Sequence, residues 1–432
     1  MLLVAGIGLL WVGCGEEQVA RPEETVTNRI VAFYQSEEDF ELGLIELNGE
    51  REDIEWGSEF TPQRPYTHVR LSAADGAGDP GPPRYVSLKA VYTDQHLYIL
   101  AQWVDSGPDQ LKDVFVYVGP DLGAPIISCA EVGGETICDS LFRHAAEDSL
   151  LSPAWWTRAG DDDKLALAFE MDPAFDDRAG FSDVGCQVAC HPGESPPFGP
   201  MSGGRIDIWY WLAGRTDPIR NLFSPYDDPN DPAQGIPGYL DDWYIDRAFG
   251  LSPDPGKPGY WRNNDPGSRI PKWVYRCDDD NFCEPTTPDQ CENEFGESCR
   301  PNNGLAEYYL WRESATARFD LFSPTDTLNQ ATRPDMRKWQ PGDIVPGYLM
   351  TYPRGSRADV RGKGGFEEEV GVWTLELARR LDTGDAASDV IFDPDAGREY
   401  YFTVALFDAS TRSHWGSRPQ VLVFGPRDGE EE

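Results

Sequence analysis

"YVSLKAVYTDQHLYILAQWVD", residues 85–105, is the stretch that decides the fold class. Two runs rich in β-branched and aromatic residues lie on either side of Thr93, Asp94 and Gln95. Runs of this composition with a short polar break between them are typical of a β-hairpin. We therefore expect a fold built from paired strands.

Further strand-like stretches lie along the rest of the chain. They are "DVFVYVGP" (113–120), "DDKLALAFEMD" (162–172), "GGRIDIWYWLAGR" (203–215), "GVWTLELARRL" (371–381), "YYFTVALFDA" (400–409) and "PQVLVFGP" (419–426). Helical periodicity is scarce, and its best candidate is 305–320. The 43 glycines and 36 prolines suit a loop-rich β architecture. The sequence predicts an all-β, antiparallel β-sandwich over residues 31–426, with long loop insertions, a few short helices and an acidic tail at 427–432.

The N-terminus reads as an export segment. Residues 1–14, "MLLVAGIGLLWVGC", are apolar and too short to cross a bilayer, as in a signal peptide. Gly13-Cys14 resembles a lipobox, in which Cys14 is lipidated, and the alternative is a simple secretory signal. Residues 15–30 would then be a flexible tether. We expect an exported bacterial protein, periplasmic or an outer-membrane or cell-surface lipoprotein, that meets the membrane only through this anchor.

The formal charge of −38 restricts the partners. A surface this acidic repels nucleic-acid phosphates and anionic lipid, so we expect no nucleic-acid partner. It favours a cationic protein partner or bound Ca²⁺, although solubility alone would explain the same composition.

Export gives the other cysteines a meaning, because disulfides persist outside the cytoplasm. Cys129 and Cys138 flank a short loop and are expected to pair. A small insertion at about 276–300 holds four more cysteines, for which three pairings are possible. These are Cys277, Cys283, Cys291 and Cys299. The acidic residues of this insertion are a weak candidate for Ca²⁺ and are equally explained as a solvated loop.

The stretch "DVGCQVACHPGE" (183–194) carries the chemistry. Cys186, Cys190 and His191 resemble the C-x-x-C-H attachment site of a c-type haem, with one extra residue between the cysteines. A disulfide between Cys186 and Cys190 is the main alternative, and a reactive Cys–His pair is a minor one. Met201 could be an axial iron ligand or a packed loop side chain.

These segments together resemble the haem-binding domain of the ethylbenzene dehydrogenase and dimethyl sulfide dehydrogenase γ subunits and of related cytochrome c-552-type proteins. The resemblance rests on the order of "LKAVYTDQHLYILAQWVD", "DDKLALAFEMD", "VGCQVACH", "GGRIDIWYWLAGRTDP", "GYLDDWYID", "PGYWRNN", "GVWTLELARRL" and "YYFTVALFDASTRSHW". It implies a β-sandwich that carries one haem between its sheets and transfers electrons. Its γ subunits hold a b-type haem through Met and Lys, but the expected lysine position is Leu212 here.

For this chain the resemblance implies a c-type haem on Cys186, Cys190 and His191, with a b-type haem as the alternative. His414 is the first choice for the sixth ligand and Met201 the second. Trp209 and Trp211 are candidates to contact the haem. Arg205 and Arg215 could pair with its propionates or lie in ordinary salt bridges. Asp207, Asp241 and Asp242 could approach propionates only through water or a cation.

We expect an electron-transfer protein rather than an enzyme, either a free carrier or a redox subunit of a larger complex. Its acidic surface would dock a redox partner with a basic surface. The alternative is a non-haem carbohydrate- or ligand-binding lipoprotein of the same fold, with its 14 tryptophans offering stacking surfaces.

Overall fold

The fold is seen in a computed structural model of the 432-residue chain. The residues it describes are 28–36, 47–50, 56, 65–74, 80–118, 127–132, 135–140, 156–172, 181–185, 204–217, 238–246, 250–262, 267–269, 273–275, 318–320, 344–345, 347–350, 353–411 and 413–427. The predicted export segment, with Cys14, lies outside them, as does the acidic tail beyond Arg427.

The hairpin predicted from residues 85–105 is confirmed. Strands β3 (Arg84–Tyr92) and β4 (His96–Val104) pair antiparallel. The Thr93 hydroxyl accepts hydrogen bonds from the backbone N–H groups of Gln95 (3.3 Å) and His96 (3.1 Å). A threonine that bonds its own following backbone stabilises a tight turn, which is why the chain reverses here.

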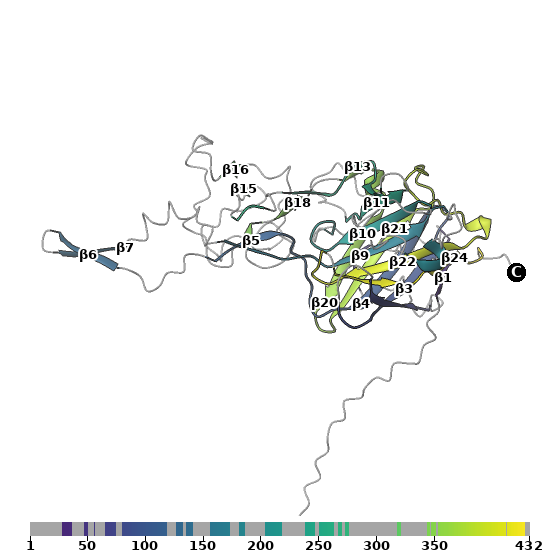
Figure 1. Ribbon diagram of the computed structural model, residues 1–432, viewed down its shortest axis with the longest axis horizontal. Helices are drawn as coiled ribbons and strands as arrows, with labels where there is room; N and C mark the ends of the chain where they lie inside the picture. The colour runs from purple at the N-terminus through teal and green to yellow at the C-terminus, as the bar shows by residue number, and fades with distance from the viewer. Residues whose placement is uncertain are drawn as a thin grey trace, which may run out of the picture.

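Thirteen strands form one hydrogen-bonded sheet, whose central strands lie side by side in Figure 1. Its main path runs β12-β11-β10-β9-β22-β23-β2-β3-β4-β21-β20, and β1 and β24 join it beside β3 and β22. The strands not yet given are β1 (Arg29–Tyr34), β2 (Thr67–Ala73), β9 (Lys164–Glu170), β10 (Ile206–Leu212), β11 (Asp241–Asp246), β12 (Gly250–Pro253), β20 (Arg361–Glu367), β21 (Val372–Arg380), β22 (Tyr400–Phe407), β23 (Trp415–Ser417) and β24 (Gln420–Phe424).

The sheet folds over on itself, so that its two ends pack face to face. Trp103 of β4 meets Trp211 of β10 edge-on at 5.7 Å, although the two strands are far apart in the sheet order. Trp373 of β21 completes this group, 5.1 Å from Trp211. One core cluster draws its side chains from both ends of the sheet. The predicted β-sandwich is therefore confirmed, with β1 as a parallel exception beside β24 and β3.

Strands β3, β4 and β21 are buried on both faces. Leu97, Ile99 and Trp103 of β4 belong to the main core, whereas Tyr98 and Leu100 pack in a second cluster. Leu47 and Trp56 cover that second face. A strand covered on both sides reads as a continuous apolar run, which explains "LYILAQW" at 97–103.

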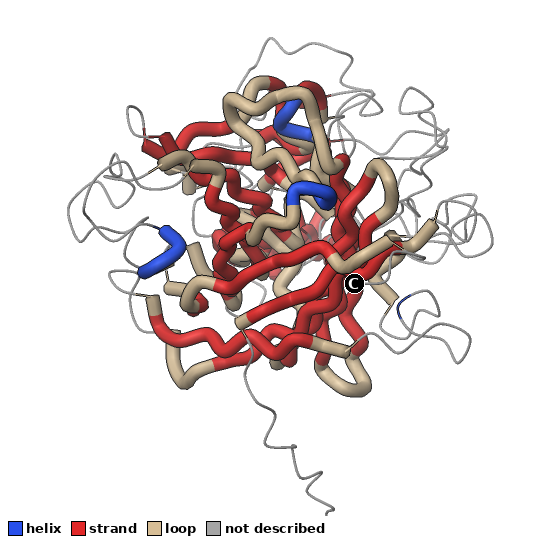
Figure 2. The backbone as a smooth tube through the Cα atoms, turned by 90° about the vertical axis from the view of Figure 1, so that its right-hand side faces the viewer, coloured by secondary structure: helices blue, strands red, loops and turns tan. Residues whose placement is uncertain are grey.

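The remaining elements are short, and Figure 2 shows the few helices as small blue segments among the red strands. The other strands are β5 (Val114–Tyr117), β6 (Ile127–Val132), β7 (Glu135–Ser140), β8 (Trp156–Ala159), β13 (Gly256–Lys257), β14 (Tyr260–Arg262), β15 (Trp273–Tyr275), β16 (Arg318–Asp320), β17 (Ile344–Val345), β18 (Tyr348–Met350) and β19 (Arg354–Gly355). Among the described residues the helices are α3 (Phe181–Val184), η6 (Ser356–Ala358) and η7 (Pro394–Ala396).

Three further expectations from the sequence can be compared with single elements of the structure. Strand β1 begins at Arg29, within the residues expected to be a tether. Strand β16 occupies the end of the helix candidate at 305–320, so that stretch is not helical throughout. In the β6–β7 hairpin Cys129 lies directly opposite Cys138, and their disulfide remains a prediction. No helix among the described residues is long and apolar enough to cross a membrane.

Candidate functional site

Helix α3 fixes the chain immediately before the Cys-x-x-x-Cys-His stretch. The N–H of Gly185 bonds to the carbonyl of Phe181 at 2.7 Å and closes the helix. Gly185 has φ +69°, and an added Cβ would come within 2.9 Å of Thr403 Cγ2. Only glycine fits this left-handed position against strand β22. Cys186 therefore follows a residue that is fixed on the outer face of the sandwich.

The predicted haem-attachment residues themselves lie outside the described residues. These are Cys186, Cys190, His191 and the alternative ligand Met201. The four cysteines of the insertion, Cys277, Cys283, Cys291 and Cys299, lie outside them as well. Their predicted roles therefore stay predictions, and the described parts of the site are its surroundings.

His414 lies against the same outer face of β22. Its ring stacks on Phe407, with the centroids 4.5 Å apart and the planes at 25°. Phe407 also contacts Tyr210 of β10 at 5.9 Å. His414 is only 6% exposed, so the imidazole is held in an aromatic, largely dry setting. This differs from the surface histidine that the sequence left as the alternative.

The inner face of β10 is filled by core packing. Trp209 and Trp211 are both fully buried. Trp209 lies 4.6 Å from Phe169 and 6.1 Å from Phe392, and Trp211 packs on Trp103 and Trp373. Interiors packed this closely do not admit a macrocycle without displacing the rings. The residues between the two ends of the sheet therefore do not fit a haem.

Arg205 is already paired at the start of β10. Its guanidinium bonds Asp172 through Nε at 2.7 Å and through Nη2 at 3.2 Å. It also donates to the backbone carbonyls of Ala386 and Ala387. Arg205 therefore lies in an ordinary salt bridge, the second of the two alternatives. Its guanidinium links the segment after β9 to the loop at 386–387.

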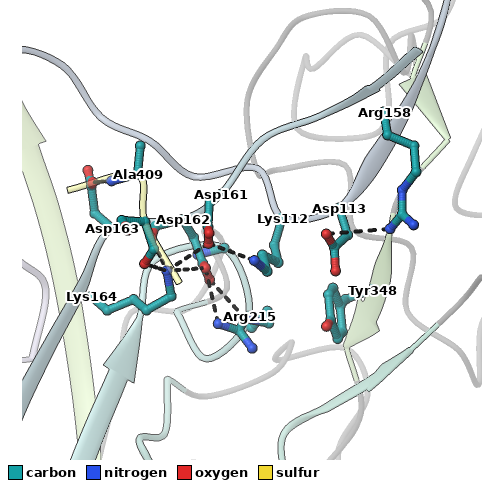
Figure 3. Close-up of polar contacts among 12 residues, drawn as sticks. Lys112, Asp113, Arg158, Asp161, Asp162, Asp163, Lys164, Arg215, Tyr348 and Ala409 are labelled. Carbon is teal, nitrogen blue, oxygen red and sulfur yellow. Dashed lines mark hydrogen bonds and ion pairs between the residues drawn. The ribbon is translucent and has the colours of Figure 1, made fainter. Parts of the chain in front are cut away.

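Arg215 belongs to a buried ionic network, shown in Figure 3. Its Nε lies 2.9 Å from Asp162 Oδ2. Lys164 meets the other oxygen of Asp162 at 3.1 Å, and Lys164 and Lys112 share Asp161 Oδ1 at 2.8 Å and 2.7 Å. The charges in this group are mutually satisfied, so Arg215 holds the turn after β10 rather than facing solvent.

The pKa of Asp162 reports this pairing. Burial alone would raise the pKa of its carboxyl, but Arg215 and Lys164 outweigh burial and lower the pKa to about 2. Nearby Asp163 has fewer opposing charges, and burial raises its pKa to about 7. Two adjacent carboxyls thus have opposite preferences because only one of them faces the cations.

Replacing Asp162 by Asn is expected to lower the free energy of unfolding by about 3–5 kcal/mol at neutral pH, because Arg215 and Lys164 lose their buried partner. The folded pKa lies below the ordinary value of 3.8. The pairing energy is therefore fully present above that value and is lost as the pH falls toward 2. Denaturant titrations should show a difference between wild type and variant that is constant near pH 7 and narrows below about pH 4.

The matched control is Asp94→Asn. Asp94 pairs with Arg427 at a similar 2.8 Å, but both side chains are exposed. An exposed pair contributes at most about 1 kcal/mol. Equal losses in the two variants, or a loss from Asp162→Asn that does not change with pH, would contradict the role given to Asp162.

A second acidic group lies inside the sandwich, beside Trp209. It contains Asp207, Asp242, Asp389, Asp254 and Asp359 around Arg379. Burial, and then the charge of Asp207, raise the pKa of Asp242 well above its usual range. Burial, and then Asp389, raise the pKa of Asp254 to about 8.

Only two of the five aspartates in this group were candidate site residues in the sequence. It singled out Asp207 and Asp242 as possible propionate neighbours, but the structure puts both in the interior. Asp389, Asp254 and Asp359 were not singled out at all. One signal in the sequence could have found this group. In "DIWYW" the aspartate alternates with the two tryptophans, so it lies on the inward-facing side of the strand, where an apolar residue is expected.

Comparisons with known proteins identify a family for most of the chain. The family model described as ethylbenzene dehydrogenase matches residues 69–418. No curated protein matches the chain. Among solved structures, a carbohydrate-binding module of family 9 from Caldicellulosiruptor kristjanssonii, in complex with glucose, is similar at 8% identity and a TM-score of 0.26, over 94% of this chain and 99% of that one. That similarity is too low to support an argument.

Proposed function

Because the chain belongs to the ethylbenzene dehydrogenase family, as the match over residues 69–418 establishes, we propose that it is an exported haem protein that transfers electrons. The haem would be held covalently by Cys186 and Cys190, with His191 as the first iron ligand. The observation that carries the proposal is the C-x-x-x-C-H stretch within a chain of this family. A bound haem supplies reversible one-electron chemistry.

The surroundings favour the outer face of β22 over the space between the sheets. A Cβ added at Gly185 would lie 2.9 Å from Thr403 Cγ2, and His414 stacks on Phe407, so both segments lie beside this one strand. Four strand residues span about 14 Å. The six residues from Gly185 to His191 can extend over about 20 Å. His191 can therefore reach the neighbourhood of His414, which we propose as the sixth ligand.

The chain's own residues have two tasks in this proposal. Phe407 stacks on the His414 imidazole, which fixes its plane and covers one side of it, and Tyr210 packs in turn against Phe407. Exclusion of water and the choice of axial ligand are the means by which a protein sets a haem potential. The net charge of −38 would steer a partner with a basic surface, and this association should weaken as salt is added.

The chain is proposed to have no catalytic step of its own. It would act as a free carrier or as a redox subunit, placed in the periplasm or at the cell surface by the export segment. The N-terminal lipid on Cys14, if attached, would be its contact with the membrane.

The test is the absorption spectrum of the full chain, produced in a host that attaches c-type haem and recorded before and after dithionite reduction. We expect a Soret band that sharpens and an α band that appears on reduction. His414→Ala should shift the ferric spectrum toward a five-coordinate, high-spin form and change the midpoint potential, because the sixth ligand is lost.

The control for His414 is His68→Ala. His68 is another histidine on a strand and bonds Ser87 Oγ at 2.8 Å, so its loss should leave the spectrum unchanged. A spectrum unaltered by His414→Ala would overturn the sixth-ligand assignment. Exported, folded protein with no Soret band would overturn the haem proposal itself.

A further inference from the structure

Three aspartates converge inside the sandwich, where side chains are normally apolar. Asp207 comes from β10, Asp242 from the neighbouring β11, and Asp389 from the loop that follows β21. Each offers a carboxylate oxygen, and these oxygens all lie within 4.8 Å of one another. The three residues are 0%, 0% and 1% exposed. Like charges are brought together here out of water, which costs free energy unless something offsets it.

Arg379 supplies the one guanidinium seen in the group among the described residues. It approaches Asp207 Oδ2 at 2.8 Å and Asp389 Oδ2 at 3.5 Å. It reaches Asp359 Oδ1 only at 3.9 Å. Asp254 adds a fifth carboxylate, since its backbone N–H bonds the Asp242 carbonyl and Ser356 Oγ bonds both Asp254 and Asp389. The carboxylates therefore outnumber the cation.

Asp242 is the residue that points to a missing ligand. Within the described part of the chain, neither of its carboxylate oxygens has a hydrogen-bond partner, although the residue is completely buried. Buried polar atoms in folded proteins are nearly always satisfied, and an exception needs an explanation. Other acceptors of the group share this condition: Asp207 Oδ1, Asp254 Oδ1 and both oxygens of Asp359.

We infer that Asp207, Asp242 and Asp389 bind a divalent cation, and that Ca²⁺ is the ion they select. Asp254 and Asp359 are placed to complete the oxygen set. Ca²⁺ takes six to eight oxygen ligands in flexible geometry. Mg²⁺ demands a near-ideal octahedron and gives up its waters reluctantly, which a dry interior does not suit. Zinc prefers nitrogen and sulfur ligands, and the group offers oxygen alone.

A second three-carboxylate group in the same protein shows what a satisfied cluster looks like. Asp105, Asp163 and Asp408 also bring carboxylate oxygens within 4.8 Å of one another. Arg84 pairs with both Asp105 and Asp408. Asp163 accepts from Trp373 Nε1 at 3.1 Å and from the N–H groups of Ala409 and Asp109. Its oxygens need no ion, so Ca²⁺ is not inferred there.

The cation would join elements that are distant in the sequence. Asp207 and Asp242 lie on adjacent strands at one end of the sheet, and Asp389 follows β21 near the other end. An ion that binds all three closes the sandwich across its interior at the edge of the Trp209 packing, where Arg379 lies 5.2 Å from the Trp209 ring. The role inferred is structural, independent of any haem.

The test uses the full chain, stripped with EDTA and desalted, followed by thermal unfolding while CaCl₂ or MgCl₂ is added. At about a hundred times its Kd, Ca²⁺ should raise Tm by about 3 °C, and Tm should keep rising with the logarithm of the Ca²⁺ concentration. Mg²⁺ at the same concentration should raise Tm less. Asp242→Asn should abolish the Ca²⁺ response and leave the stripped protein at least as stable as wild type, because a buried, uncompensated charge is gone.

Asp408→Asn is the matched control, since it removes one charge from the satisfied group and should keep the full Ca²⁺ response. Asp389→Asn provides a second test of the site and should behave like Asp242→Asn. Absence of a Ca²⁺-dependent rise of Tm in wild type would overturn the inference. The inference would also be overturned if Ca²⁺ raised the Tm of Asp242→Asn and Asp389→Asn as much as that of wild type. The ion would then bind acidic residues elsewhere, such as the cysteine-rich insertion.

Discussion

The double substitution Cys186→Ala and Cys190→Ala is expected to leave the exported protein without covalently attached haem. Each cysteine of such a site forms one thioether bond, so removal of both leaves no bond to the group. The measurement is acid–acetone extraction after maturation in a competent host. The wild-type protein should keep its colour in the protein pellet, and the double variant should release all of it.

The matched control is the double substitution Cys129→Ala and Cys138→Ala. These two cysteines also lie close in sequence, directly opposite each other in the β6–β7 hairpin. Their removal should leave the haem in the pellet, even if a disulfide is lost. Haem that is extracted from wild type and from the Cys186/Cys190 variant alike would mean a b-type site, and would make the covalent attachment wrong.

Arg379→Met is expected to lower the free energy of unfolding by about 3–5 kcal/mol, a loss as large as that expected for Asp162→Asn. Both Arg379 and its closest partner Asp207 have fully buried side chains, 2.8 Å apart. Methionine keeps much of the side-chain volume, so the loss would come from the unpaired carboxylates rather than from a cavity. Denaturant unfolding in EDTA measures it without a contribution from bound cations.

Arg29→Met is the control for burial. Arg29 pairs with Glu399 at 2.7 Å, but the two side chains are 56% and 40% exposed. Solvent screens such a pair, so its loss should cost no more than about 1 kcal/mol. If Arg379→Met cost no more than Arg29→Met, the acidic group would not depend on its guanidinium.

Most of the sheet could be predicted from local sequence because its strands have strong patterns. The hairpin at 85–105 emerged as β3 and β4, and the predicted stretches at 113–120, 162–172, 203–215, 371–381, 400–409 and 419–426 each contain a strand. In every case β-branched and aromatic residues lie between turn residues, which is the most reliable strand signal. The sandwich followed from the number of such stretches and the scarcity of helical periodicity.

Strand β20, "RGKGGFE", could not be predicted in this way. A side chain at Gly364 would approach Trp211 Cζ2 to 2.4 Å, and one at Gly365 would approach the Gly49 carbonyl oxygen to 2.2 Å. These glycines are required by close packing of distant segments, yet glycine is a poor strand former when the strand is considered alone. Tertiary contacts that are remote in sequence decided this strand.

The interior acidic group was hidden for the same reason. Asp207 and Arg379 are 172 residues apart in the chain, and no local pattern joins them. The period-2 alternation of the strand places Asp207 on the same face as Trp209 and Trp211, but Asp207 was considered only as a possible neighbour of the haem propionates. The proposed haem-attachment residues are the opposite case, because their motif is a short continuous stretch that can be recognised in the sequence. Their positions in the fold are not given, since Cys186, Cys190 and His191 lie outside the described residues.

Strand β10 has different roles on its two faces. Its inner face carries Asp207, Trp209 and Trp211 into the core, whereas its outer face brings Tyr210 beside Phe407 and His414. Trp209 and Trp211, which the sequence suggested as haem contacts, therefore form part of the hydrophobic core. We propose that the redox site lies on the side that the sequence emphasised less.

The most direct test of the covalent haem is the intact mass of the exported wild-type protein, measured under denaturing acid conditions. The account predicts a mass above that of the processed chain by one haem, and loss of this increment in the Cys186/Cys190 double variant. A wild-type mass equal to that of the processed chain with its cysteines oxidised to disulfides would contradict the account.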